Sequence, residues 1–112
     1  MGTKMKELPK AETYEEALEY WPYRTSLQTV IKNICERAPH GARLLDVMCG
    51  PGYLLGKIKE LRPDLILYGV DIDERYVLHG GEVYAGVKFE KGDVLDWQPK
   101  EQFDVVVCTG SV

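Results

Sequence analysis

The stretch from Leu44 to Leu61, LLDVMCGPGYLLGKIKEL, limits the fold of this chain more than any other part of the sequence. It begins with a short apolar run, which suits a buried strand of a parallel sheet. A tight turn with Gly50 and Gly52 follows, and apolar residues then recur at helical spacing up to Pro63, which ends the helix. The order of strand, glycine turn and helix predicts the first half of a nucleotide-binding βαβ unit.

The glycines of this turn indicate a bound ligand. A ligand lying across the end of the strand must approach the backbone closely, and a Cβ atom at Gly50 or Gly52 would block it. The N–H groups at the start of the following helix would face that ligand. A plain strand-to-helix turn explains the same residues, so the turn alone leaves both interpretations open.

The composition excludes several classes of protein. The chain has 112 residues and a formal net charge of −4, so we expect one small globular domain without a broad basic surface for nucleic acid. It contains no apolar segment long enough to span a membrane, and its first residues lack the apolar core of a secretory signal. We therefore expect a cytoplasmic protein that binds neither nucleic acid nor membranes.

The cysteines, Cys35, Cys49 and Cys108, occur without close pairing. The sequence has neither a CxxC pair nor a nearby Cys/His spacing, so it predicts no metal site and no disulfide. We expect all three to be reduced and buried as small hydrophobic residues.

Residues 1–40 are expected to form an N-terminal helical extension, and residues 41–112 a partial Rossmann-like cofactor-binding domain, together one globular unit. The spacing of Thr13 and Glu16 predicts a capped first helix, and Pro22 can open a second. Aromatic residues and one cation in this region either form a lid over a ligand or pack on the sheet, and we favour packing. They are Tyr14, Tyr20, Trp21, Tyr23 and Arg24.

Further strands are expected over residues 65–70, 87–90 and 103–108. Asp73 is in position to cap a helix that starts at Glu74, and the run His79-Gly80-Gly81 is expected to end that helix. We give His79 little weight as a catalytic base. The alternation of strands and helices predicts an α/β fold with a parallel sheet.

Two aspartates follow predicted strands at the positions where open α/β sheets bind ligands. Asp71 ends the second strand about twenty residues after the glycine turn, where an acid can accept hydrogen bonds from both hydroxyls of a ribose. Asp93 follows the third strand, near the same crevice. Asp93 also suits an ordinary turn or capping position.

Four segments in this order resemble the motifs of the class I S-adenosylmethionine-dependent methyltransferases. They are residues 44–52, 68–73, 92–94 and 103–107. The resemblance implies a Rossmann-like sheet whose first four strands have the order 3-2-1-4, within a larger family sheet. It also implies methyl transfer from S-adenosylmethionine by direct displacement, which we expect to be directed to a small molecule.

By resemblance, the methionyl portion of S-adenosylmethionine would contact Asp46, Gly50 and Gly52. Met48 stands where the family usually has its first glycine, which would narrow the space near that portion. The floor under the sulfonium would be lined by Cys108 and Thr109.

At the nucleoside end, the resemblance assigns the ribose hydroxyls to Asp71 and the face of the adenine to Ile72. Asp93 would accept a hydrogen bond from the adenine amino group, with Val94 beside it. No catalytic residue is assigned, because the family's residues for substrate choice and proton removal mostly follow its fourth strand.

Other interpretations stay open. A non-catalytic module could bind S-adenosylmethionine or S-adenosylhomocysteine, and a fragment could need a partner chain. An interaction protein that uses the Tyr- and Trp-rich N-terminal helices has only compositional support. A nicotinamide-binding domain is less favoured, because its G-x-G-x-x-G motif requires a glycine at Leu55, and Gly56 is one residue late.

The fourth expected strand, residues 103–108, is apolar and would lie at the edge of such a sheet. An unpaired apolar edge invites pairing with another chain. We therefore expect a homodimer or a partner chain at this strand, or a longer enzyme of which this chain is a part.

Overall fold

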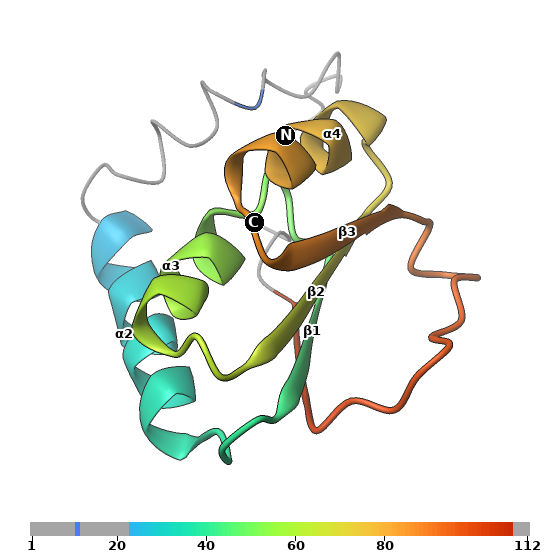
Figure 1. Ribbon diagram of the computed structural model, residues 1–112. Coiled ribbons are helices and arrows are strands. Elements are labelled where there is room, and N and C mark those ends of the chain that lie inside the picture. The colour runs from blue at the N-terminus through green and yellow to red at the C-terminus, as the bar shows by residue number, and fades with distance from the viewer. Residues whose placement is uncertain (1–10, 12–22, 109–112) are drawn as a thin grey trace, which may run out of the picture.

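The computed structural model describes Ala11 and residues 23–108 of the 112-residue chain. The expected helix at Thr13, the aromatic residues before Tyr23, and Thr109 lie outside the described residues, as do the side chains of Tyr23 and Arg24. The helices and strands, labelled in Figure 1, are α2 (Tyr23–Arg37), β1 (Arg43–Val47), α3 (Tyr53–Leu61), β2 (Ile66–Asp71), α4 (Glu74–Val83), β3 (Val87–Lys91) and β4 (Val105–Cys108).

The strands form one parallel sheet in the order β3-β2-β1-β4, which confirms the predicted α/β fold and strand order. β1 lies inside the sheet, where Asp46 is paired with Gly69 of β2 and with Val107 of β4. Helices α3 and α4 make the crossovers from β1 to β2 and from β2 to β3, as parallel strands require. The carboxyl ends of all the strands therefore lie at the same edge of the sheet.

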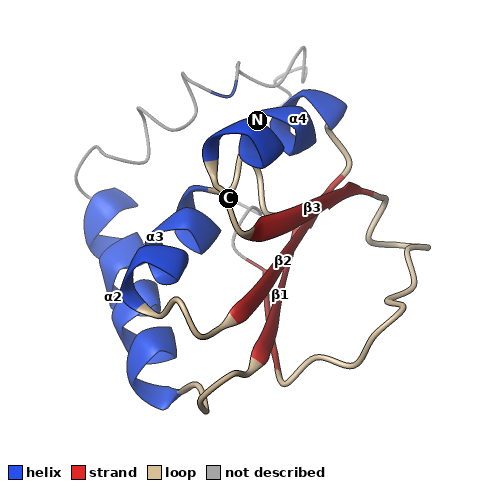
Figure 2. Cartoon of the chain, in the orientation of Figure 1, coloured by secondary structure: helices blue, strands red, loops and turns tan. Residues whose placement is uncertain are grey.

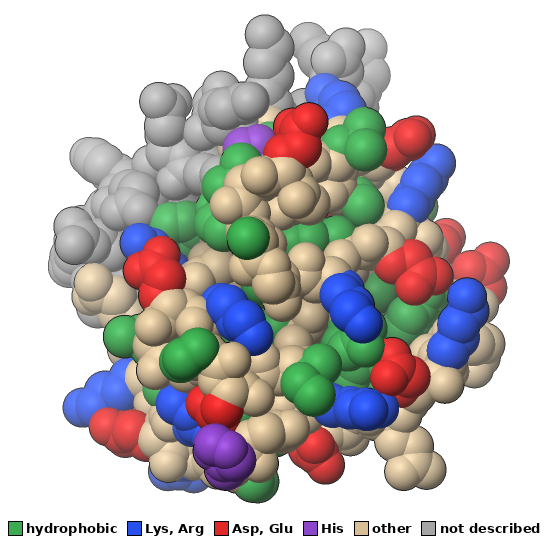
Figure 3. Space-filling view, in the orientation of Figure 1, with side chains coloured by type: hydrophobic (Ala, Val, Ile, Leu, Met, Phe, Trp, Pro, Cys, Tyr) green, Lys and Arg blue, Asp and Glu red, His purple; other side chains and the backbone are tan. Residues whose placement is uncertain are grey.

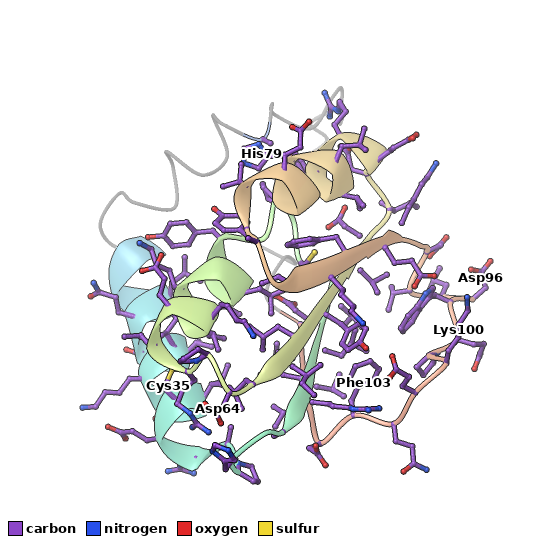
Figure 4. All side chains as sticks on the ribbon, in the orientation of Figure 1. Cys35, Asp64, His79, Asp96, Lys100 and Phe103 are labelled. Atoms are coloured by element: carbon purple, nitrogen blue, oxygen red, sulfur yellow. The ribbon has the colours of Figure 1, made fainter. Side chains whose placement is uncertain are left out.

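The described helices cover one face of the sheet. Figure 2 shows α2, α3 and α4 on the same side, with segment 92–104 running along the other side. On that second face, Val106 is 60% exposed, and the Phe103 ring packs edge-on against Tyr68 with 5.1 Å between ring centroids. Figure 4 shows Phe103 on the side of the sheet away from the helices.

The hydrophobic core lies between the helices and the sheet. Leu44 and Leu67 of the strands meet Leu55 and Ile58 of α3, and all of these side chains are buried. Burial of one such side chain contributes about 1.5–3 kcal/mol. The core also takes in apolar side chains of α2, namely Ile31 and Ile34. The division of the chain near residue 40 stays a prediction.

The ring of Phe89, on β3, packs among three glycines. A Cβ atom at Gly69 of β2 would lie 3.0 Å from this ring, and one at Gly80 of α4 would lie 2.7 Å from it. The third is Gly52, before α3. Our expectation that His79, Gly80 and Gly81 end the helix is wrong, because α4 continues to Val83. Gly80 serves instead as the contact that lets α4 lie close to the sheet.

The Arg62 guanidinium ties the end of α2 to the loop before β2. It donates to the Cys35 carbonyl at 2.7 Å and to the Ala38 carbonyl at 3.1 Å, and it holds Asp64 through two hydrogen bonds of 2.8 and 2.7 Å. Asp64 in turn accepts from the Gly41 N–H at 2.9 Å. Figure 4 shows Cys35 and Asp64 on the helix side of the sheet.

The cysteines differ in burial. Cys49 is buried, Cys35 is partly exposed and Cys108 is exposed, so the expectation of three buried thiols is wrong for Cys108. The reason is that β4 lies at the edge of the sheet and Cys108 is its last residue. Within the part of the chain that the structure describes, none of the three forms a disulfide.

The described surface mixes both signs of charge. Figure 3 shows basic and acidic side chains interspersed with hydrophobic ones on the face in view. Among the described helices, none is long and apolar enough to cross a membrane. Within the same residues, no group of three or more His, Cys, Asp or Glu side chains is placed to hold a metal ion.

Candidate functional site

The candidate site lies at the carboxyl edge of the sheet. β1 ends at Val47, β2 at Asp71, β3 at Lys91 and β4 at Cys108. In open α/β sheets, ligands bind in the crevice outside these ends, at the point where the strand order reverses. Here the reversal falls at β1, because the chain proceeds from β1 to β2 and β3 on one side and returns to β4 on the other.

The turn after β1 has an unusual backbone conformation. Met48, Gly50 and Gly52 have φ angles of 62°, 61° and 97°, all in the left-handed region. The Cys49 N–H donates to the Val70 carbonyl at 3.0 Å, which fixes the turn against the end of β2. Gly52 then caps α3 without a side-chain hydrogen bond.

Two features of the fold require Gly52 to lack a side chain, independently of any ligand. Its φ angle is one that residues with a Cβ rarely adopt, and a Cβ atom there would lie 2.5 Å from the Phe89 ring. Phe89, the support beneath this turn, was not predicted from the sequence. The signal was available in Gly69 and Gly80, two glycines inside regular elements, which indicate a large side chain packed between them.

Asp71 joins the glycine turn to the start of α4. One oxygen of its carboxylate accepts from the Gly50 N–H at 2.8 Å, and the other accepts from the Asp73 N–H at 2.9 Å. The residue is only 9% exposed. A carboxylate has about four acceptor positions, so these two bonds leave acceptor capacity for a ligand.

Two neighbours of Asp71 have distinct environments. Ile72 is 59% exposed, so it presents an apolar side chain directly beside the carboxylate. Asp73 caps α4 by accepting from the Arg75 N–H at 2.9 Å, which confirms the predicted cap. The hydrogen bond from the Arg75 side chain lowers the pKa of Asp73.

Asp93 lies in the turn that follows β3. Its Oδ1 accepts from the Leu95 N–H at 3.0 Å, and its carbonyl accepts from the Trp97 N–H at 2.7 Å. Asp93 therefore stabilises this turn, which was the alternative interpretation of the residue from the sequence. Val94, next to it, is 42% exposed.

The ends of β1 and β4 meet through two sulfur atoms. Met48 Sδ lies 3.8 Å from Cys108 Sγ. Met48 directly follows Val47, and Val47 is the β1 residue paired with Cys108. Thr109, the other residue assigned to this end of the site, lies outside the described residues.

Asp46 and Cys49 lie in the interior below this edge. Asp46 is fully buried, and Cys49 is 6% exposed. Burial raises the pKa of the Cys49 thiol, and the negative charges of Asp46 and Asp71 add to this effect. These residues therefore shape the turn from inside, and Cys49 stays a neutral thiol.

Two hollows lie away from this edge. One, of about 640 Å³, lies between α2 and α3 and is bordered by Leu27, Ile31, Lys57 and others. The second, of about 380 Å³, lies on the second face of the sheet beside Tyr68 and Trp97. Among the described residues that line these two hollows, none is assigned to the cofactor from the sequence, so we place the candidate site at the carboxyl edge.

Comparison with known families decides the class of this chain. The family model described as "Methyltransferase domain" matches residues 44–112, more than half of the chain. The chain belongs to the class I S-adenosylmethionine-dependent methyltransferase family. Membership in this methyltransferase family disfavours the alternative of a nicotinamide-binding domain.

Curated relatives of this methyltransferase domain include trans-aconitate 2-methyltransferases. The protein of that name from Rhodococcus jostii is 32% identical over 83 residues, which are 74% of this chain and 31% of the relative. The one from Mycobacterium tuberculosis is 31% identical over 70 residues, 62% of this chain and 26% of the relative. The methyltransferase domain thus spans about a quarter to a third of the curated relatives it matches.

Solved structures share the fold of this methyltransferase domain. A TehB-like methyltransferase from Corynebacterium glutamicum superposes with a TM-score of 0.69 at 23% identity, over 89% of this chain and 54% of that chain. A sugar N-methyltransferase from Streptoalloteichus gives a TM-score of 0.72 at 22% identity, over 97% and 43% of the two chains. At these identities the likeness establishes the fold.

Proposed function

We propose that this domain binds S-adenosylmethionine at the carboxyl edge of the sheet and supplies it for methyl transfer to a small molecule. The observation that carries the proposal is the Asp71 carboxylate, which is held by Gly50 and Asp73 at the end of β2. A fixed carboxylate with acceptor positions to spare suits the diol of a ribose. The family membership supports the choice of S-adenosylmethionine as the nucleoside.

The residues near Asp71 fit a nucleoside. The exposed side chain of Ile72 offers an apolar surface for one face of the adenine, and Val94 extends this surface from the turn after β3. Asp93 Oδ1 already accepts from the Leu95 N–H, and the second oxygen of the same carboxylate can accept from the adenine amino group. The nucleoside would thus lie across the ends of β2 and β3.

The methionyl portion would lie on the other side of Asp71, along the turn after β1. Gly50 and Gly52 would let it approach the backbone. Asp46, which is fully buried below this edge, would affect this portion indirectly, by supporting the turn from inside. Cys108, at the end of β4, would line the floor under the sulfonium together with Thr109.

The chemistry that S-adenosylmethionine supplies when bound is an activated methyl group. Transfer forms a bond from the acceptor to the methyl carbon and breaks the bond to sulfur, which leaves as the neutral thioether of S-adenosylhomocysteine. The residues of this chain hold and orient the donor, which is the main contribution that such a reaction requires from a protein.

We propose a small organic acid as the first acceptor class to test. The name of the curated relatives, trans-aconitate 2-methyltransferase, gives the reason. A carboxylate is already deprotonated at neutral pH, so its methylation needs no general base. His79 is not proposed as a base, because it lies on α4 and packs edge-on against Tyr84.

Calorimetric titration of S-adenosylhomocysteine tests the proposed site. Replacing Asp71 by alanine removes a charged acceptor, so we expect a loss of about 1–3 kcal/mol, roughly 5- to 150-fold in affinity. Because Asp71 also holds the turn, a second variant, Ile72→Ala, removes only exposed apolar surface and should weaken binding without unfolding the domain. Leu78→Ala is the matched control, since Leu78 is 61% exposed against 59% for Ile72.

Methyl transfer to a panel of small organic acids then separates the enzyme from a binding module. Transfer of the methyl group supports the enzymatic function. Binding of S-adenosylhomocysteine without transfer to any acid favours the non-catalytic module. Unchanged affinity in both Asp71→Ala and Ile72→Ala would place the nucleoside elsewhere and contradict the proposed site.

A further inference from the structure

Met48 is a side chain held where the backbone favours glycine. Among the described residues, it alone combines a side chain with a positive φ, at 62°. Residues with a Cβ rarely adopt this conformation, because the Cβ comes too close to the following carbonyl oxygen. The surrounding turn, fixed by the bond from the Cys49 N–H to the Val70 carbonyl, imposes the conformation on Met48.

The conformation of Met48 determines where its side chain goes. Met48 follows the last residue of β1, and its sulfur reaches to 3.8 Å from the sulfur of Cys108, the last residue of β4. The side chain therefore spans the gap between the carboxyl ends of β1 and β4. Met48 is half-buried, so the thioether is packed there and not extended into solvent.

The two halves of the carboxyl edge consequently differ. On the β2 side, Asp71 keeps acceptor capacity, and Ile72 is 59% exposed. On the β4 side, the Met48 thioether occupies the space beside Cys108. A nucleoside can settle on the first half as it is, while an amino-acid tail reaching the second half must displace a packed side chain.

We infer that Met48 is a specificity-determining residue that restricts the methionyl end of the site. The inference rests on the function proposed above. It predicts that the domain recognises its thioether nucleosides mainly through the adenosine moiety. S-adenosylhomocysteine would then bind little more tightly than 5′-methylthioadenosine, which has the same nucleoside and sulfur but lacks the amino-acid tail.

Calorimetric titration with these two nucleosides tests the inference. For the unsubstituted domain we expect affinities within about threefold of each other, less than 1 kcal/mol. In Met48→Gly, the thioether is gone and the left-handed backbone is favoured, so affinity for S-adenosylhomocysteine should rise about tenfold, 1.4 kcal/mol. The affinity for 5′-methylthioadenosine should change by less than about threefold in the same variant.

Two further variants separate the side chain from the backbone. Met48→Ala keeps a Cβ in the left-handed conformation but removes the thioether, so it should show the same selective gain as Met48→Gly. Leu95→Ala removes an apolar side chain that is 90% exposed on the β3 side, and it should leave both affinities unchanged. Thermal unfolding of each variant checks that the domain is folded.

The outcomes distinguish this inference from the proposed function. Strong preference of the unsubstituted domain for S-adenosylhomocysteine, unchanged in Met48→Gly and Met48→Ala, would overturn the role of Met48 and leave the proposed cofactor site standing. A selective gain in both variants would support the role of Met48. Failure of every folded variant to bind either nucleoside would overturn the role of Met48 and the proposed function together.

Discussion

The carboxylate of Asp71 accepts a hydrogen bond from the Gly50 N–H at 2.8 Å, which links the end of β2 to the turn after β1. Its second oxygen accepts from the Asp73 N–H at the start of α4. The residue that we assign to the ribose is thus also the residue that holds the glycine turn in place. Recognition of the nucleoside and the shape of the turn depend on the same side chain.

This dual role predicts a stability effect for Asp71→Asn. An amide offers one acceptor oxygen, so its NH₂ group must face either the Gly50 or the Asp73 N–H. We expect a loss of about 1–3 kcal/mol in the free energy of unfolding, measured by urea denaturation. Asp96→Asn, at an exposed position of the turn after β3, is the control and should change stability by less than about 0.5 kcal/mol. Equal stability of the two variants would argue against the Asp71 bridge.

Two adjacent glycines of α4 should respond oppositely to the same substitution. A Cβ atom at Gly80 would lie 2.7 Å from the Phe89 ring, whereas one at Gly81 meets nothing within 4 Å. Gly80→Ala should therefore destabilise the domain by about 1–3 kcal/mol through overpacking. Gly81→Ala should stabilise it by about 0.5–1 kcal/mol, because alanine is the better helix former.

Urea denaturation of both alanine variants tests this pair. A double variant with Phe89→Ala supplies the control for the packing argument, since removing the ring should remove most of the cost of Gly80→Ala. If Gly80→Ala proved as stable as Gly81→Ala, the close packing of α4 on β3 would be wrong.

The Arg62–Asp64 pair predicts a dependence of stability on acid. The hydrogen bond from Arg62 holds the pKa of Asp64 below its usual range. A carboxyl whose pKa is lower in the folded state stabilises the fold above the pKa of the unfolded chain, about 3.9. Stability should therefore fall as the pH drops below about 4, and the fall should be smaller in Asp64→Asn and in Arg62→Gln. If the free energy of unfolding, measured by urea denaturation, fell equally with pH in all three proteins, this pair would not contribute to the acid dependence.

The three thiols should differ in reactivity. Burial raises the pKa of the Cys49 thiol, with the charges of Asp46 and Asp71 adding to it, so Cys49 should resist alkylation in the folded domain. Cys108 is exposed and should react first. Mass spectrometry after a timed reaction with iodoacetamide reads out each site. S-adenosylhomocysteine should slow alkylation of Cys108, and rapid modification of Cys49 in the folded protein would contradict its placement under the turn.

Much of this fold followed from residues whose effect is local. The apolar run at Leu44 predicts a strand, the glycine turn predicts its end and the start of a helix, and the acid at Asp71 marks the end of the next strand. Crossover connections between parallel strands have a single handedness, so these elements can be joined in one way. The cap at Asp73 was also predictable, because an aspartate before a helix has a short-range physical reason.

Contacts between distant elements could not be read from the sequence in the same way. Gly80 looked like a helix end, because the partner that requires it, Phe89, follows it in a later strand. Cys108 looked buried, because its apolar neighbours do not reveal that β4 lies at the edge of the described sheet. The bond from Gly50 to Asp71 joins residues 21 positions apart and appears only when β1 and β2 are paired.

The most direct test of the central claim is a crystal structure of the domain with S-adenosylhomocysteine. We predict that the ribose hydroxyls lie on the Asp71 carboxylate, with the adenine against Ile72 and Val94 at the ends of β2 and β3. A nucleoside bound instead in the hollow between α2 and α3, with Asp71 holding only Gly50 and Asp73, would contradict it.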